Sequence, residues 1–363
     1  MKVVVVGAGV AGLCVGWRLA KAGADVTVIE RAEPGAGATR AAAGMISIAG
    51  EASLAGSVEL DFSRHASSLW PEFAAELEEA SGRQISYSRK GALIVRLAGE
   101  GTTGAPPSED LVETVDGARA RVIEPMLTGE YAEILWAPGE AQVDNRALGP
   151  ALAEAFARAG GKLVRGDAVS AIARAEGRAV GAIGVRTRYN ADAVVIAAGA
   201  WTTDIEGLPD ELRRTVKPIK GEMIALSSAA RATRLTRVVR GSAAYLVPRG
   251  DRVFVGATEE NVGFDPGLTD RALDELKRAA ARLVPALVGW EVSEHWAGFR
   301  PGTPDGLPIL GPTSVEGLFA ATGQYRNGIL FAPAIAELLC RAVLEHGQVP
   351  AEFDPRRFAA GVD

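Results

Sequence analysis

The chain has 363 residues, 48% of them hydrophobic, which is enough to bury one large core or two moderate ones. Its formal charge is −6, and its 39 lysines and arginines are scattered without a basic block, so we expect no nucleic-acid partner. Cys14 and Cys340 lie far apart in apolar helical contexts, and we expect buried thiols in a reducing cytoplasm rather than a disulfide. The three histidines have no cysteine or histidine neighbour at ligand spacing, so no metal site is expected.

Two apolar stretches resemble membrane or export segments. Residues 3–17 are uncharged and follow Lys2, but a glycine-rich turn within them explains this stretch better than a signal peptide. Residues 330–344 are interrupted by Glu337 and Arg341 and are too short to span a bilayer. We therefore expect no membrane segment.

The first thirty-one residues predict a βαβ unit that binds a dinucleotide. A β-branched apolar strand, residues 2–6, runs directly into a G-x-G-x-x-G turn that opens a helix. Gly7 permits the tight turn, and Gly9 has no Cβ to keep a pyrophosphate from the backbone. Gly12 lets the helix pack closely on the strand, so that the helix N-terminus can point its free N–H groups at the phosphates.

An acidic residue completes this unit. Glu30 closes the second strand, residues 25–29, where a carboxylate can accept hydrogen bonds from a ribose 2′-OH. A carboxylate at this position disfavours a 2′-phosphate, and hence NADP. From these residues alone, NAD and FAD both remain possible.

The rest of the chain alternates helical and extended patterns. Residues 31–45 form a loop of small residues, which either links flexibly or lets the backbone approach a large flat ligand; its place after a nucleotide fold favours the ligand. We predict helices over residues 59–81, 108–115, 145–159, 269–283 and 328–344. We predict strands over residues 92–97, 132–136, 162–164, 168–173, 182–187, 193–198, 222–226, 237–240, 245–249, 253–256, 289–297 and 317–321. The short alternating strands of residues 220–255 indicate an antiparallel sheet in a second domain, interleaved with the first.

Four separated stretches together resemble one family. They are the N-terminal fingerprint, Ala41–Met45 (AAAGM), Trp296–Gly306 (WAGFRPGTPDG) and Ala321–Ile329 (ATGQYRNGI). Over essentially its whole length the chain resembles the D-amino-acid oxidase superfamily of flavoproteins, and within it most closely the glycine oxidases. The resemblance replaces NAD by FAD. It implies an α/β fold in which a Rossmann-like FAD-binding domain (1–84, 142–217 and 297–363) is interleaved with a substrate-binding domain on an antiparallel sheet (85–141 and 218–296).

The resemblance also assigns residues to the cofactor. The ADP half would be held by Gly7, Gly9, Val10, Ala11, Gly12, Glu30 and Arg31, with the backbone of Val169 at the adenine. The flavin would be approached by Thr39, Ala41, Ala42, Ala43, Gly44, Met45, Ala198, Gly199, Trp201, Arg300, Gly323, Tyr325, Arg326, Asn327, Gly328 and Ile329. A helix that begins near Gly328 would direct free N–H groups at the flavin edge where negative charge develops. Relatives with covalent flavin carry a cysteine where this chain has Gly298, so we expect noncovalent FAD.

Four residues are candidates for contact with an amino-acid substrate. Arg300 offers a planar two-point match to a carboxylate, and Tyr245 matches a family tyrosine that hydrogen-bonds the same group. By resemblance Arg326 contacts substrate, flavin or both, and Met45 lines the pocket, although a methionine is more often plain packing. Glu259 departs from the pattern, because some glycine oxidases have an apolar residue there.

The resemblance implies FAD-dependent oxidation of glycine or a similar small amino acid by dioxygen, yielding an imine, then a 2-oxo acid and ammonia, with hydrogen peroxide. Hydride transfer from Cα to a flavin needs no protein base, in keeping with the absence of a convincing catalytic histidine or lysine. The alternatives are a D-amino-acid dehydrogenase that passes electrons to a quinone, and a protein in which the flavin is only structural. We expect a homo-oligomer.

Overall fold

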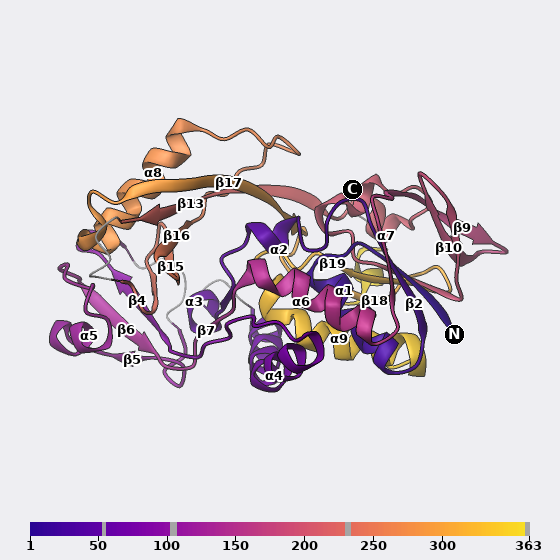
Figure 1. Ribbon diagram of the computed structural model, residues 1–363, viewed down its shortest axis with the longest axis horizontal. Helices are drawn as coiled ribbons and strands as arrows, with labels where there is room; N and C mark the ends of the chain where they lie inside the picture. Colours follow the sequence, from indigo (N-terminus) through magenta and orange to yellow (C-terminus); the bar gives the residue numbers. More distant parts are fainter. Residues whose placement is uncertain (53–55, 102–106, 229–233, 360–363) are drawn as a thin grey trace.

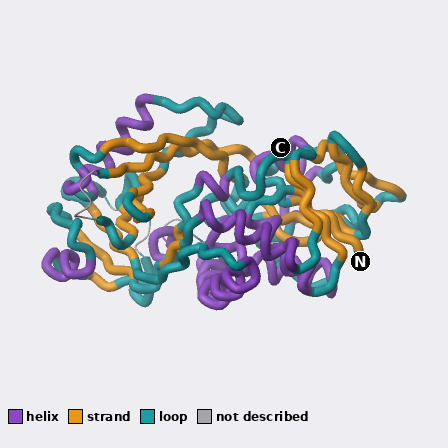
Figure 2. The backbone as a smooth tube through the Cα atoms, viewed as in Figure 1, coloured by secondary structure: helices purple, strands orange, loops and turns teal. Residues whose placement is uncertain are grey.

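The computed structural model describes residues 1–52, 56–101, 107–228 and 234–359 (Figure 1). It confirms the α/β fold class. Figure 2 shows the strands in two groups, with most of the helical segments between and below them. Within the described residues no helix is long and apolar enough to cross a membrane. Cys14 is buried and Cys340 half-buried, and neither forms a disulfide.

The first group is a sheet of six strands within the described residues, in the order β18-β19-β12-β1-β2-β8. The strands are β1 Lys2–Val6, β2 Asp25–Glu30, β8 Lys162–Arg165, β12 Ala193–Ile196, β18 Ile309–Pro312 and β19 Leu318–Thr322. Pairing is parallel except between β18 and β19. Residues 3–6 of β1 are at most 4% exposed, because both faces of the sheet are covered.

Each face of this sheet has its own core. Val3 and Val5 pack with the helices α1 (Val10–Lys21), α4 (Ser57–Ser81), α6 (Asn145–Arg158) and α9 (Gly328–Glu345). Val4 and Val6 pack on the opposite side, with α7 (Asp210–Arg213) and with β9 (Val169–Ala175) and β10 (Arg178–Gly184). These two strands pair with each other, and β10 also pairs with β11 (Arg188–Asn190). The alternation along β1 therefore assigns successive valines to the two cores.

The second group is a sheet of eight strands within the described residues, ordered β17-β13-β16-β15-β14-β4-β6-β5. The strands are β4 Ala92–Arg96, β5 Glu113–Thr114, β6 Glu133–Ala137, β13 Lys217–Ser227, β14 Val238–Arg240, β15 Tyr245–Arg249, β16 Arg252–Gly256 and β17 Glu291–Gly302. One face packs under α8 (Asp270–Leu283). The other face presents Met223, Val247 and Phe254 to Ala43 and Met45, which lie in the half that contains the six-stranded sheet. Figure 1 shows β13 and β17 as long strands reaching toward that half.

Short elements complete the fold. They are α2 Ala38–Ala41, β3 Met45–Ile46, α3 Ala49–Ala52, α5 Gly117–Ile123, β7 Ala141–Gln142 and the 3-10 turns Gly199–Asp204, Pro285–Leu287 and Pro355–Phe358. Of the four proposed domain boundaries, 217/218 and 296/297 fall inside β13 and β17 and 141/142 falls inside β7, and we retain them as a proposal.

One predicted helix is wrong. Residues 108–115 form a turn and then β5, because Glu113 and Thr114 pair with β6 and the Val115 amide donates to the Ile134 carbonyl. The helix of this region is instead α5, which begins after Asp116, whose side chain caps the Arg119 amide.

Three further expectations differ in extent. The strand expected at 182–187 lies at 178–184, and the strand expected at 289–297 continues to residue 302. The loop at 31–45 contains the short helix α2, and β18 was not predicted. The other predicted helices and strands are confirmed, with ends shifted by a few residues.

Candidate functional site

A cavity of about 730 Å³ lies between the two sheets. Its walls come from the glycine turn, the segments 36–45 and 197–201, the strands β13, β15, β16 and β17, and the start of α9. These segments are far apart in sequence. The cavity combines a nucleotide-type phosphate loop with the antiparallel sheet, and this combination sets its chemistry.

Two of the three fingerprint glycines are required by the packing of the chain, and the third leaves open space in the cavity. Gly7 has φ +104°, and a Cβ there would lie 2.5 Å from the Ala197 carbonyl oxygen. A Cβ on Gly12 would lie 2.0 Å from the Gly7 carbonyl oxygen, so both glycines are required by the packing of the chain itself. A Cβ on Gly9 would have no protein atom nearer than Thr39 Oγ1 at 3.7 Å. Because Gly9 lines the cavity, the space that its missing Cβ leaves is available to a phosphate.

Glu30 supports the glycine turn as well as lining the cavity. Its carboxylate accepts the amide N–H of Ala8 at 2.8 Å and of Ala32 at 2.9 Å. Next to it, the Arg31 guanidinium lies 3.7 Å from the centre of the Trp201 ring. Residues 167–169 line the same end of the cavity. This end therefore offers a carboxylate, a stacked arginine and backbone groups to a nucleotide.

The loop of small residues is a fixed wall of the cavity. Three side chains from outside it donate to its carbonyl groups: Asn145 Nδ2 to Thr39 (3.0 Å) and Arg40 (2.9 Å), Trp296 Nε1 to Ala41 (3.0 Å), and Arg249 to Ala43. A Cβ on Gly298 would lie 2.3 Å from Ala41 Cβ, so β17 also packs directly against the loop. A flat ligand would meet a preformed surface here.

The start of α9 forms another wall. Gly328 and Ile329 line the cavity, so the N–H groups of the first helical turn are close to it. The buried Gln324 also lines the cavity, and its Nε2 has no hydrogen-bond partner in the part of the chain that the structure describes. An unpaired buried amide favours a bound ligand with an acceptor oxygen.

Arg300 and Tyr245 line the sheet side of the cavity. Arg300 Nη1 donates to the Thr258 carbonyl at 3.2 Å, and its guanidinium occupies the space above Gly221, where a Cβ would lie 2.5 Å from Nη1. Burial raises the pKa of Tyr245, although the charges of Arg300 and Arg240 act in the opposite direction. The phenol thus keeps its proton at neutral pH and can donate a hydrogen bond.

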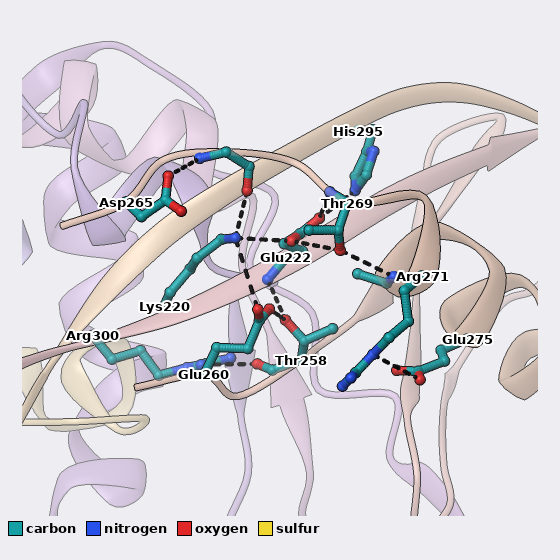
Figure 3. A network of polar contacts seen from close by, with 12 residues as sticks. Lys220, Glu222, Thr258, Glu260, Asp265, Thr269, Arg271, Glu275, His295 and Arg300 are labelled. Carbon is teal, nitrogen blue, oxygen red and sulfur yellow. Dashed lines mark hydrogen bonds and ion pairs between the residues drawn. The ribbon is translucent and has the colours of Figure 1, made fainter. Parts of the chain in front are cut away.

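A buried polar network that includes Lys220 and Glu222 holds the segment to which Arg300 is hydrogen-bonded (Figure 3). Lys220 and Glu222 are at most 1% exposed, and Lys220 Nζ lies 3.0 Å from Glu222 Oε1. The Glu222 amide donates to Thr258 Oγ1 at 2.8 Å, which holds the residue whose carbonyl binds Arg300. His295 Nε2 lies 2.8 Å from Glu222 Oε2, so His295 belongs to this network and lies outside the cavity lining.

Two ion pairs also border the sheet side. Arg326 Nη2 bonds Glu259 Oε2, and Arg240 Nη1 lies 2.5 Å from Glu51 Oε1. All four residues line the cavity. Glu51 and Arg240 were not predicted from the sequence, and neither were Gly221 and Met223.

The cavity brings together most of the residues that the sequence nominates. Those lining it are Gly7, Gly9, Val10, Ala11, Glu30, Arg31, Thr39, Ala41, Ala42, Ala43, Gly44, Met45, Val169, Ala198, Gly199, Trp201, Tyr245, Arg300, Tyr325, Arg326, Gly328 and Ile329. Gly12, Gly323 and Asn327 are not in the lining. Gly323 has φ +74° and packs on Thr303, and Asn327 Nδ2 donates to Glu59 Oε1 at 2.8 Å, so both shape the α9 turn from outside.

Comparison with known proteins matches residues 2–342 to the family described as DAO, FAD-dependent oxidoreductase. The chain belongs to this family. It is 33% identical to glycine oxidase of Pseudomonas aeruginosa, covering 99% of this chain and 98% of that protein. It is 35% identical to the bifunctional protein ThiO/ThiG of Trichormus variabilis over 98% of this chain, and it spans about half of the length of that relative, 55%. The crystal structure of glycine oxidase from Geobacillus kaustophilus superposes with a TM-score of 0.86 at 30% identity, covering 98% of this chain and 99% of that one.

Membership in the DAO family makes the chain an FAD-dependent oxidoreductase. The open space at Gly9 and the unpaired Gln324 amide suit FAD, whose pyrophosphate needs backbone N–H groups and whose ring carries acceptor oxygens. The glycine turn, Glu30 and Arg31 would hold the nucleotide end. The loop at 39–45 and the start of α9 would hold the ring.

Proposed function

We propose that this flavoprotein oxidises the carbon–nitrogen bond of glycine or of a similarly small amino acid or amine, such as sarcosine or a small D-amino acid. One observation carries the proposal: the guanidinium of Arg300 and the phenol of Tyr245 line one cavity together with the phosphate loop. A carboxylate binds such a pair well, because a guanidinium gives two parallel hydrogen bonds and the phenol a third.

Each substrate-side residue then has a role. Arg300 and Tyr245 bind the carboxylate and fix its orientation, while Met45 and Met223 present an apolar surface to Cα. Fixing the carboxylate at one end restricts how Cα can be oriented in the cavity. FAD, when bound, supplies the two-electron acceptor for the oxidation.

The overall reaction we propose for glycine consumes one dioxygen and one water and yields glyoxylate, ammonia and hydrogen peroxide. The substrate reacts with its amine neutral, and the imine product is hydrolysed by water. No side chain is required as a base, so the residues act by binding and orientation.

Similarity to ThiO/ThiG supports a contribution to thiamine thiazole synthesis as part of this proposal. We also keep three expectations from the sequence within it: noncovalent FAD, a cytoplasmic location and a homo-oligomer. Gly298 has no side chain to form a covalent bond, and Ala41 fills the space where one would begin.

The test is oxygen consumption and peroxide release by the purified yellow protein with glycine, sarcosine, D-alanine, D-proline and L-alanine. We expect fastest turnover with glycine or sarcosine and stoichiometric peroxide. Arg300→Ala should raise KM by about 100-fold or more with FAD retained, and Arg300→Lys should recover part of the loss. Arg271→Ala, at a surface arginine that is 81% exposed, is the control.

Two results would contradict the proposal. Dye reduction without peroxide would assign the chain to the dehydrogenases that use another electron acceptor. Parent-like oxidation of glycine by Arg300→Ala would remove Arg300 from substrate binding.

A further inference from the structure

Charged side chains on the substrate side of the cavity are unequally paired. We define this side by the lining contributed by β13 to β17, residues 257–259, Glu51 and Arg326. Within the described residues it carries the arginines Arg240, Arg300 and Arg326 and the glutamates Glu51 and Glu259. Three positive charges thus face two negative ones.

The pairing leaves one arginine without a carboxylate. Arg240 is bonded to Glu51, and both side chains are nearly enclosed, at 14% and 13% exposed. Arg326 is bonded to Glu259 at the more open edge of the cavity, where the two side chains are 35% and 46% exposed. Arg300 has no carboxylate within ion-pair distance in the described part of the chain, and its Nη1 donates to the backbone carbonyl of Thr258. The substrate side therefore has one uncompensated cation.

Glu259 is held in place by its neighbours along the chain. Thr258 Oγ1 donates to Glu260 Oε1 at 2.9 Å (Figure 3). The backbone of Glu260 exchanges two hydrogen bonds of 3.0 Å with Lys220. Partial burial raises the pKa of Glu259, but Tyr325, Arg326 and Arg300 outweigh it and hold this pKa below its usual range. Glu259 is consequently a fixed anion at neutral pH.

We infer that Glu259 determines substrate specificity: by neutralising Arg326 it leaves Arg300 as the one arginine without a carboxylate partner among the described residues of the substrate side, so the site takes amines with one carboxylate and rejects those with two. The inference rests on the proposed function and names its substrate class. Iminodiacetate, which is glycine with a second carboxymethyl group on nitrogen, would place its second carboxylate near Glu259 and meet repulsion instead of a partner.

The experiment compares Glu259→Gln with the parent protein. Binding is measured by perturbation of the flavin absorbance with two ligands that cannot be oxidised as amines, methoxyacetate and diglycolate, and turnover with sarcosine and iminodiacetate. We expect the parent to prefer the monocarboxylate of each pair. Glu259→Gln should shift both preferences toward the dicarboxylate by at least about tenfold, because Arg326 becomes available to it.

Two further variants test whether the shift in ligand preference comes from the Glu259–Arg326 pair. Glu275→Gln removes the same charge from a comparable arginine pair on α8, outside the cavity lining, and should leave the preference unchanged. In the double variant Glu259→Gln with Arg326→Gln, the shift toward the dicarboxylate should disappear, because the guanidinium of Arg326 is no longer present to bind the second carboxylate.

An unchanged ligand preference in Glu259→Gln, or a gain that survives in the double variant, would overturn the inference. Failure of the proposed function can be distinguished from failure of this inference. If no amine is oxidised, that function falls, while the ratio of the two ligand affinities still tests the pairing of Arg326 with Glu259.

Discussion

Gly221→Ala tests whether the space beside β13 sets the position of Arg300. An ideal Cβ on Gly221 would lie 2.5 Å from Nη1, 2.6 Å from Nη2 and 2.8 Å from Cζ of Arg300. Ordinary contacts between such atoms are about 3.5 Å, so the guanidinium has to move by about 1 Å. A displacement of this size at a substrate-orienting group costs about 100-fold in kcat/KM, or about 2.7 kcal/mol of transition-state stabilisation. Folding should change little, because the displaced atoms end a flexible side chain.

The assay is oxidation of glycine followed by oxygen uptake, with FAD content and thermal unfolding measured in parallel. Gly117→Ala is the control, because a Cβ on Gly117 meets no atom within 4 Å. In an Arg300→Ala background, Gly221→Ala should have no further effect, since both changes act through one side chain. Retention of kcat/KM within about threefold of the parent would refute the reasoning, as would a full loss that persists in the Arg300→Ala background.

Other perturbations address the cofactor side and the pH response. Gly9→Val should abolish FAD binding, because its side chain fills the space that Gly9 leaves for a phosphate; a fully loaded yellow variant would contradict the phosphate-loop assignment. Asn145→Ala removes two hydrogen bonds to the loop at 39–45 and should lower the free energy of unfolding by about 2 kcal/mol and weaken FAD binding, both measurable by titration. Hydrogen bonds from Arg146 hold the pKa of Glu294 below its usual range, so this carboxylate stabilises the fold above about pH 4.3 and loses that contribution as pH falls through its lowered pKa. Melting temperatures of Glu294→Gln and the parent should therefore differ at pH 7 and converge toward pH 3.

Prediction from the sequence succeeded where local signals agreed with one another. The βαβ unit combines a buried β-branched strand, a glycine turn and an acidic residue at the end of the second strand. All three features indicate the same nucleotide-binding structure. The helix predicted at 108–115 is wrong because the composition of the segment allows a short helix, whereas its structure depends on strand pairing. Glu113 and Thr114 pair with β6, about twenty residues later in the sequence. Strand pairing of this kind is a tertiary effect that propensity does not contain.

The same distinction applies to the cavity. Residues in the fingerprint and in the C-terminal motif could be nominated because they follow a recognisable pattern. Gly221 could not, since its role depends on the register that sets it beside Arg300, in which Ile219 pairs with Arg300 across β13 and β17. Glu51 and Arg240 come from α3 and β14 and meet only in the folded chain. Glycine inside a strand often marks a close approach, but the strand predicted at 222–226 begins after Gly221, so this signal was missed.

The buried Lys220–Glu222 pair is best understood through the loop that it holds. A buried ion pair gives little net stability, because desolvation of both charges offsets their attraction. Here Lys220 also bonds the Gly267 carbonyl, and Glu222 accepts the Thr269 amide at 3.0 Å, so the pair fixes both ends of the segment 258–269. That segment carries the carbonyl that binds Arg300 and the carboxylate that binds Arg326. The cost of burying two charges in the sheet therefore secures the position of two others in the cavity, one left free for a carboxylate and one neutralised.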